Sequence, residues 1–179
     1  MTTPVTAVAL GLVLGCTSAL AASPYAGQDS REIKALSAEE ISALLAGKGM
    51  GLAKAAELNG FAGPAHVLEL ASELHLTAEQ RARTEALFSS MSTKAAVRGR
   101  ALVEKERELD GLFAARTITP ERLASRLREI GALQAEVRAA HLEAHLAQVE
   151  ILTAEQNSRY SELRGYGAAA ENGAHEHKH

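Results

Sequence analysis

Apolar side chains recur every three or four residues along most of this chain, in segments separated by capping residues, glycines and prolines. The two longest segments are residues 77–115 and 119–151, and Thr119-Pro120 opens the second with a helix cap and a first-turn proline. Two long helices joined by so short a connection must lie antiparallel. The pattern therefore predicts an all-α fold built on a long helical hairpin. Gly99 makes a break of the first helix possible near Arg98, because glycine weakens helices.

Shorter helices are expected before the hairpin. Ser37 and Glu40 are spaced as a capping box, which predicts a helix that runs to about Gly47. Residues 46–64 contain repeated glycines and read as a loop with one short helical piece at 52–58. Another helix is predicted over 64–75, with Pro64 at its first turn.

One pentapeptide, LTAEQ, occurs twice, at residues 76–80 and 152–156. In each copy the Thr and the Gln have capping-box spacing, so that the Thr hydroxyl and the Gln side chain satisfy backbone groups at a helix start. The Leu would anchor the entry of the chain into the core. The six motif residues are Leu76, Thr77, Gln80, Leu152, Thr153 and Gln156. No further repeat lies between the copies, so the motif predicts two helix starts and not a solenoid.

The chain divides into four parts. Residues 1–21 read as a signal peptide, with an apolar run too short to span a bilayer and a small-residue cleavage pattern before Ala22. An alternative is lipoprotein processing at Cys16, the only cysteine. Residues 22–66 form an N-terminal extension with short helices, 67–166 the hairpin domain, and 167–179 a flexible tail. Both processing routes predict export, and a periplasmic location is expected.

Composition narrows the function. Apolar residues make up 46% of the chain and aromatic residues only 3%, which is typical of long helices. The net charge is −3 and no basic block is present, so the sequence lacks the cluster of positive charge that nucleic-acid binding requires. The sequence has no P-loop, no nucleophile-elbow motif and no dinucleotide fingerprint. We therefore expect a protein that is not an enzyme and requires no cofactor.

The paired L-T-x-x-Q motifs, the signal peptide and the all-helical body resemble the Spy/CpxP family of periplasmic proteins, which includes ZraP and the CnrX-type metal sensors and resistance proteins. The resemblance covers roughly residues 68–166. It implies a bent helical hairpin that dimerises into a cradle. It also implies one of three roles: an ATP-independent chaperone for unfolded or misfolded envelope proteins, an envelope-stress regulator that acts on a membrane signalling protein, or a heavy-metal-binding protein.

A histidine pair bears on this choice. The apolar stripe of the second long helix passes through Leu123, Leu127, Ile130, Gln134 and Val137. His141 and His145 share its face, and the i,i+4 spacing allows both imidazoles to bind one metal. A turn centred near 117–118 would place Lys94 opposite His141 and Ser90 opposite His145, with Met91 close to that level. Two imidazoles and a thioether suit Cu, Ni, Co or Zn, with Glu85, Ser90 or water completing the shell. The alternative is that both histidines only form hydrogen bonds across the seam.

The tail carries the second candidate for metal binding. It ends with three alternating histidines, His175, His177 and His179, which would chelate divalent ions without geometric selectivity. The alternative is a tail that serves only solubility. Two hypotheses follow: a chaperone of the Spy/CpxP type, with or without a response to metal, and a periplasmic heavy-metal sensor or resistance protein that uses His141, His145 and the tail.

Overall fold

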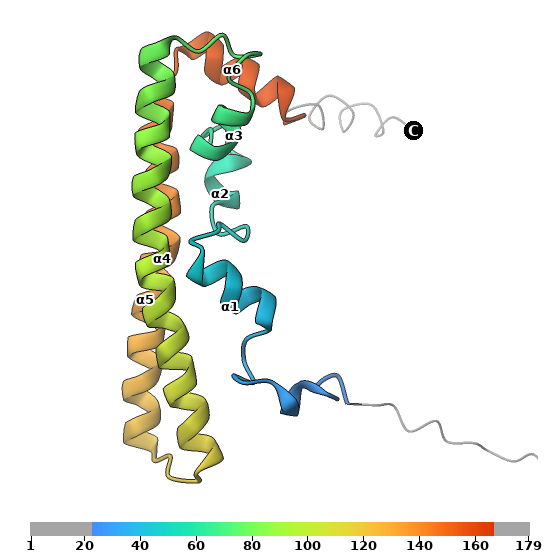
Figure 1. The fold of residues 1–179 in the computed structure, drawn as a ribbon, viewed down its shortest axis with the longest axis vertical. Helices are drawn as coiled ribbons and strands as arrows, with labels where there is room; N and C mark the ends of the chain where they lie inside the picture. The colour runs from blue at the N-terminus through green and yellow to red at the C-terminus, as the bar shows by residue number, and fades with distance from the viewer. Residues whose placement is uncertain (1–22, 167–179) are drawn as a thin grey trace, which may run out of the picture.

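The computed structural model describes residues 23–166, and these form an all-helical fold without strands (Figure 1). A short 3₁₀ turn at Gln28–Ser30 comes first. The α-helices are α1 (Ala38–Leu45), α2 (Lys54–Glu57), α3 (Pro64–Glu69), α4 (Ala78–Ala114), α5 (Pro120–Val149) and α6 (Ala154–Leu163). None of these helices is both long and apolar enough to cross a membrane.

Helices α4 and α5 form the predicted antiparallel hairpin, which confirms the central expectation from the sequence. At 37 residues, α4 extends for roughly 55 Å. Thr119 caps α5 by accepting a hydrogen bond from the backbone N–H of Arg122, and Pro120 occupies the first turn as predicted. No break occurs at Gly99, and α4 is one continuous helix.

The two LTAEQ motifs meet at the open end of the hairpin. Thr77 and Thr153 each form a complete capping box with Gln80 and Gln156. The two glutamines also pair with each other: Gln80 Nε2 lies 2.7 Å from Gln156 Oε1, and Gln156 Nε2 lies 3.1 Å from Gln80 Oε1. Each Nε2 further donates to a backbone carbonyl of the opposite motif region, at Ile151 and Leu74. The repeated pentapeptide is therefore one reciprocal joint as well as two helix starts.

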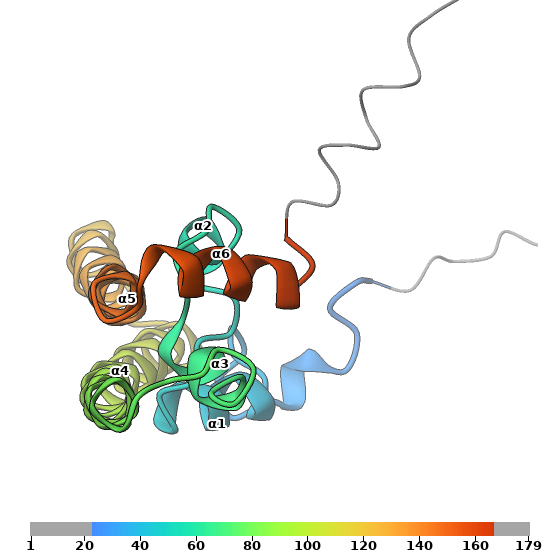
Figure 2. The same cartoon turned by 90° about the horizontal axis from the view of Figure 1, so that it is seen from above.

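The N-terminal extension packs along one side of the hairpin, and Figures 1 and 2 both place α1–α3 there. Ile33 and Leu44 of the extension form a core cluster with Leu102, Val103, Ile130 and Val137 of the hairpin. A close approach of backbones makes this packing possible, because a Cβ atom on Gly99 would lie 2.2 Å from the carbonyl oxygen of Leu44. Gly99 therefore allows α1 to pack closely on α4. The sequence had instead suggested a possible break of the helix at this position.

A second cluster joins the extension to the C-terminal helix at the open end of the hairpin. Its members are Ala62, Val67, Leu74, Leu152 and Tyr160. Seen from above in Figure 2, α6 runs from the end of α5 and passes over α2, with α3 to one side. The extension is thus held at two places, against the middle of the hairpin and beneath α6.

Two sequence predictions of local structure were wrong. The helix predicted over 64–75 ends at Glu69, and the chain then turns through His75, which has a positive φ of 50°. Leu127 and Gln134, expected in the seam, are exposed. Two helices bury only a narrow strip, so flanking positions are buried only where a third element covers them. His141, on the same face of α5 as Gln134, is buried because the extension lies over it.

Candidate functional site

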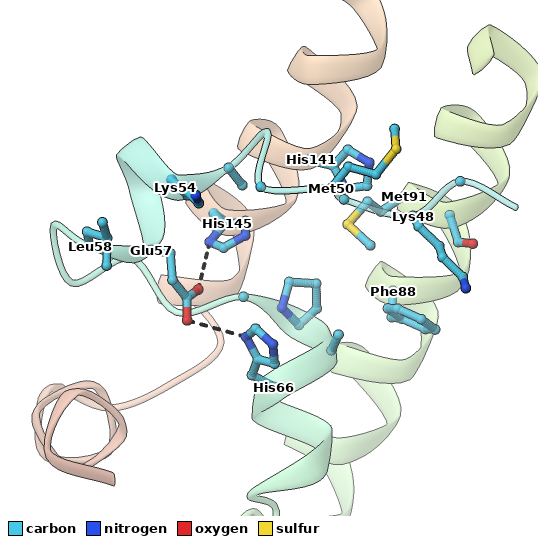
Figure 3. Close-up of a pocket in the computed structure, with 18 of the residues that line it drawn as sticks. Lys48, Met50, Lys54, Glu57, Leu58, His66, Phe88, Met91, His141 and His145 are labelled. Atoms are coloured by element: carbon cyan, nitrogen blue, oxygen red, sulfur yellow. Dashed lines mark ion pairs between the residues drawn. The ribbon is translucent and has the colours of Figure 1, made fainter. Parts of the chain in front are cut away.

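A pocket of about 610 Å³ lies between the extension and the hairpin, where the glycine-rich loop at 46–53 arches over α4 and α5 (Figure 3). Its apolar wall includes Met50, Leu58, Pro64, Phe88 and Met91. Its polar groups come from the loop, from α2 and α3, from α5 and from the chain after α6: Lys48, Lys54, Glu57, His66, His141, His145, Arg164 and Tyr166. A mostly apolar pocket with a few polar groups is the usual form of a binding site.

His141 lies deep in this wall with only 3% of its surface exposed. Its Nε2 atom is buried and has no hydrogen-bond partner among the described residues. The backbone of Gly49 covers the ring, since a Cβ atom there would lie 3.7 Å from Nδ1. Burial, together with the neighbouring His145, lowers the pKa of His141. The imidazole is therefore neutral at pH 7 and has a lone pair available for a ligand.

His145, one turn further along α5, has a defined orientation. Its Nδ1 lies 2.8 Å from the carbonyl oxygen of Phe61, and it donates the hydrogen because a carbonyl only accepts. In the neutral ring this leaves the lone pair on Nε2. The same Nδ1 lies 3.7 Å from Glu57 Oε2. Gly63 is required beside the ring, because a Cβ atom there would lie 2.7 Å from Cε1 of His145.

Glu57 is the centre of a polar network that joins the extension to the C-terminal helix. Its Oε1 accepts hydrogen bonds from Tyr160 Oη at 2.5 Å and Tyr166 Oη at 2.9 Å. Arg164 Nε and His66 Nδ1 lie 3.5 Å and 3.3 Å from the same oxygen. Burial alone would raise the pKa of Glu57, but these hydrogen bonds and the nearby histidines outweigh it, and the pKa is lowered. Glu57 is therefore a buried carboxylate ion at neutral pH.

The network also affects Tyr160, which is fully buried. Burial and the hydrogen bond to Glu57 raise the pKa of its hydroxyl, so Tyr160 remains a neutral donor. Sequence reasoning did not identify Glu57 or the two tyrosines. A glutamate in the apolar stretch KAAEL was the one available signal. Nothing in the sequence indicated that partners about a hundred positions away would surround it.

The predicted metal residues are partly brought together. His141, His145 and Met91 all line the pocket, whereas Glu85 and Ser90 do not. Gln148 donates to Thr84 across the hairpin at 3.2 Å, and two helical turns from this pair place Met91, not Lys94, opposite His141. Ion pairs nearer the turn, such as Arg98 with Glu136, differ from that alignment by two positions, so the predicted register was off by one to three residues.

Histidine, cysteine and acidic side chains do not gather in groups of three or more that could hold a metal ion anywhere within residues 23–166. The predicted tail ligands His175, His177 and His179 lie outside the described residues, as do the signal peptide and Cys16.

The fold and the paired caps define a class: helical-hairpin proteins whose two L-T-x-x-Q motifs close the open end. A family model described as "LTXXQ motif family protein" matches residues 64–164. The chain belongs to this family, of the Spy/CpxP type, as its sequence suggested. No curated protein and no solved structure matches the chain. The match begins at Pro64, so α1, and the loop and α2 that line the pocket, lie outside the family-matched region.

Proposed function

We propose that this protein is exported to the periplasm and acts there as an ATP-independent chaperone of the Spy/CpxP type. In this role it holds apolar segments of unfolded or misfolded envelope proteins and catalyses no reaction. Family membership supports the general class. The pocket between the extension and the hairpin supports the binding role.

The supporting observation is the exposed apolar surface at the mouth of this pocket. Leu58 is 61% exposed, Met50 45% and Phe88 37%, and all three line the pocket. Lys48, Lys54 and Arg164 lie among them. An apolar surface with charged side chains around it suits weak contacts with many different segments, because no single shape or hydrogen-bond pattern is required. Release then needs no energy source.

Suppression of client aggregation tests the proposal. Light scattering of a thermally unfolding client is measured with the wild-type protein and with a Leu58→Ser, Phe88→Ser variant. We expect the variant to lose most of its protection, because its binding surface is smaller. Both side chains are partly exposed, so the variant should keep its fold and its circular dichroism spectrum.

A Tyr25→Ser, Leu45→Ser variant is the matched control, since it removes two exposed apolar side chains of the extension that do not line this pocket. It should protect as well as the wild type does. Equal loss in both variants would show that general surface hydrophobicity is responsible. Full protection by the Leu58→Ser, Phe88→Ser variant would exclude the pocket as the client site.

A second candidate function is binding of a heavy-metal ion for sensing or resistance. The unpartnered, buried Nε2 of the neutral His141 favours it, because a buried nitrogen without a partner is costly unless something binds it. Isothermal titration of the protein with Zn, Cu, Ni and Co tests this function. Absence of binding in a variant whose tail histidines are replaced by Asn would exclude the site at His141 and His145 and favour the chaperone role.

A further inference from the structure

Three side chains with soft or borderline donor atoms meet at one wall of the pocket. His141 belongs to α5, Met91 to α4 and Met50 to the glycine-rich loop of the extension. The hydrogen bond between Gln148 and Thr84, two helical turns away, places Met91 at about the level of His141. Figure 3 shows the sulfur atoms of Met50 and Met91 near the His141 ring. The chain has only one other methionine, Met1, so both methionines of the described region are at this place.

The backbone at Met50 is unusual. Met50 has a positive φ of 44°, a conformation that favours glycine and that L residues with long side chains rarely adopt. Its neighbour Gly49 packs against the His141 ring, and Gly51 follows with a φ of 77°. Backbone strain of this kind is concentrated at functional sites. The Met50 side chain is not needed for the core, because 45% of it is exposed. A glycine at position 50 would suit the local fold better, so the methionine calls for another explanation.

The third donor is ready to bind. His141 Nε2 is buried without a hydrogen-bond partner. His145, by contrast, already donates from Nδ1 to Phe61 and lies beside Glu57. The wall therefore offers one imidazole nitrogen and two thioethers, with no carboxylate or thiolate among them.

We infer that Met50, Met91 and His141 form a binding site for a soft monovalent cation, Cu(I). Thioethers are soft ligands that select Cu(I), whereas Zn binds Cys, His and carboxylate groups in sites of four ligands. Within the described region no three His, Cys or acidic residues are arranged so that they could hold a metal ion together, which is consistent with this choice. The inference rests on the second candidate function and specifies its ion and its ligands. Met50 lies outside the family-matched residues, so the site would be a feature of this chain.

Anaerobic titration with Cu(I), in competition with a chromophoric chelator, tests the site. The protein is the full mature chain with His175, His177 and His179 replaced by Asn, so that the tail does not contribute. We expect one Cu(I) per chain, and X-ray absorption should show sulfur as well as nitrogen ligands. Ag(I) should compete for the same site because it has the same preference for thioethers.

Met50→Gly is the decisive variant, because it removes the thioether and also relieves the positive φ. We expect Cu(I) affinity to fall at least tenfold while the urea midpoint of the metal-free protein stays the same or rises. Met91→Leu, which conserves volume, should weaken Cu(I) binding similarly. His145→Gln is the control in the pocket: its Cu(I) affinity should stay within about twofold of the wild type because His145 is not a ligand of the inferred site, and a larger loss would contradict the inferred ligand set.

The outcomes separate the ligand set from the general function. If Met50→Gly and Met91→Leu bind Cu(I) as tightly as the wild type, the proposed site is wrong. If Zn, Ni or Co binds and His145→Gln abolishes that binding, a two-histidine site exists: the second candidate function stands and this inference fails. If no ion binds at all, both fail.

Discussion

Substitution of Gly99 by Ala tests how the extension is seated on the hairpin. In an isolated helix this change is favourable by about 1 kcal/mol, because alanine has the higher helix propensity. Here the new Cβ atom would lie 2.2 Å from the carbonyl oxygen of Leu44 and 2.8 Å from its carbonyl carbon. These are backbone atoms, so no side-chain rotation removes the clash, and α1 must move away from α4.

The expected size of the effect follows from that movement. Overpacking of a core costs about 1–3 kcal/mol, and a backbone obstacle should be near the upper end of that range. After the gain of about 1 kcal/mol in helix propensity, we expect Gly99→Ala to be destabilised by about 2 kcal/mol. Displacement of α1 would also loosen Ile33 and Leu44 in the shared core cluster.

Two other helical glycines provide matched controls. A Cβ atom on Gly111 in α4 or Gly131 in α5 would meet nothing within 4 Å. Alanine at either position should therefore stabilise the protein by up to about 1 kcal/mol. Urea unfolding at 25 °C measures all three variants, and Gly99→Ala and Gly131→Ala should differ by about 3 kcal/mol. If Gly99→Ala stabilises as much as Gly131→Ala, α1 is not packed on α4 as described.

Three further predictions concern the glutamine joint, the buried histidine and assembly. Gln80→Ala and Gln156→Ala should each lower the free energy of unfolding by about 1–3 kcal/mol, because each leaves polar groups unpaired. In a double-mutant cycle, the double variant should lose less than the sum of the two single losses. Additive losses would mean that the two motifs are independent. The lowered pKa of His141 means that the unfolded chain takes up a proton first, so metal-free protein should lose stability as the pH falls below 6.5. His141→Leu should reduce that loss, which can be measured as the urea midpoints of the wild type and the variant between pH 8 and pH 5. Midpoints that fall equally in the two proteins would contradict the prediction. The hairpin leaves Val97, Leu127 and Leu146 exposed, so we expect a homodimer, and light scattering that gives the monomer mass at all concentrations would count against it.

The sequence predicted the hairpin and the helix starts well because their determinants are local. Ser37, Thr77 and Thr153 lie three residues before the partner that completes each capping box, and Pro120 sets its own φ. The apolar repeats of α4 and α5 are long enough to fix the helical period. These signals need no knowledge of the rest of the chain.

The pocket could be predicted only in part, because it depends on non-local contacts. The His141 and His145 pair and Met91 were identified by helical spacing. Met50 and Glu57 were not, since their positions follow from how the extension docks on α4, α5 and α6. The turn at His75 was missed for the same reason. The apolar pattern continues through His75, but the chain turns there to bring the first LTAEQ motif to the second.

The contact of Glu57 with Tyr160 and Tyr166 joins the extension to residues that follow more than a hundred positions later. A polypeptide leaves the ribosome from its N-terminus, so the extension emerges well before the helix that holds it in place. Until α6 has followed, the carboxylate of Glu57 lacks its two tyrosine donors, and Ala62 and Val67 lack their contact with Tyr160. The extension can pack against α4 and α5 first, but its second attachment is completed only when α6 is present. The polar end of the pocket, where Glu57, Arg164 and Tyr166 meet, therefore takes its final form only after residues 154–166 have been made.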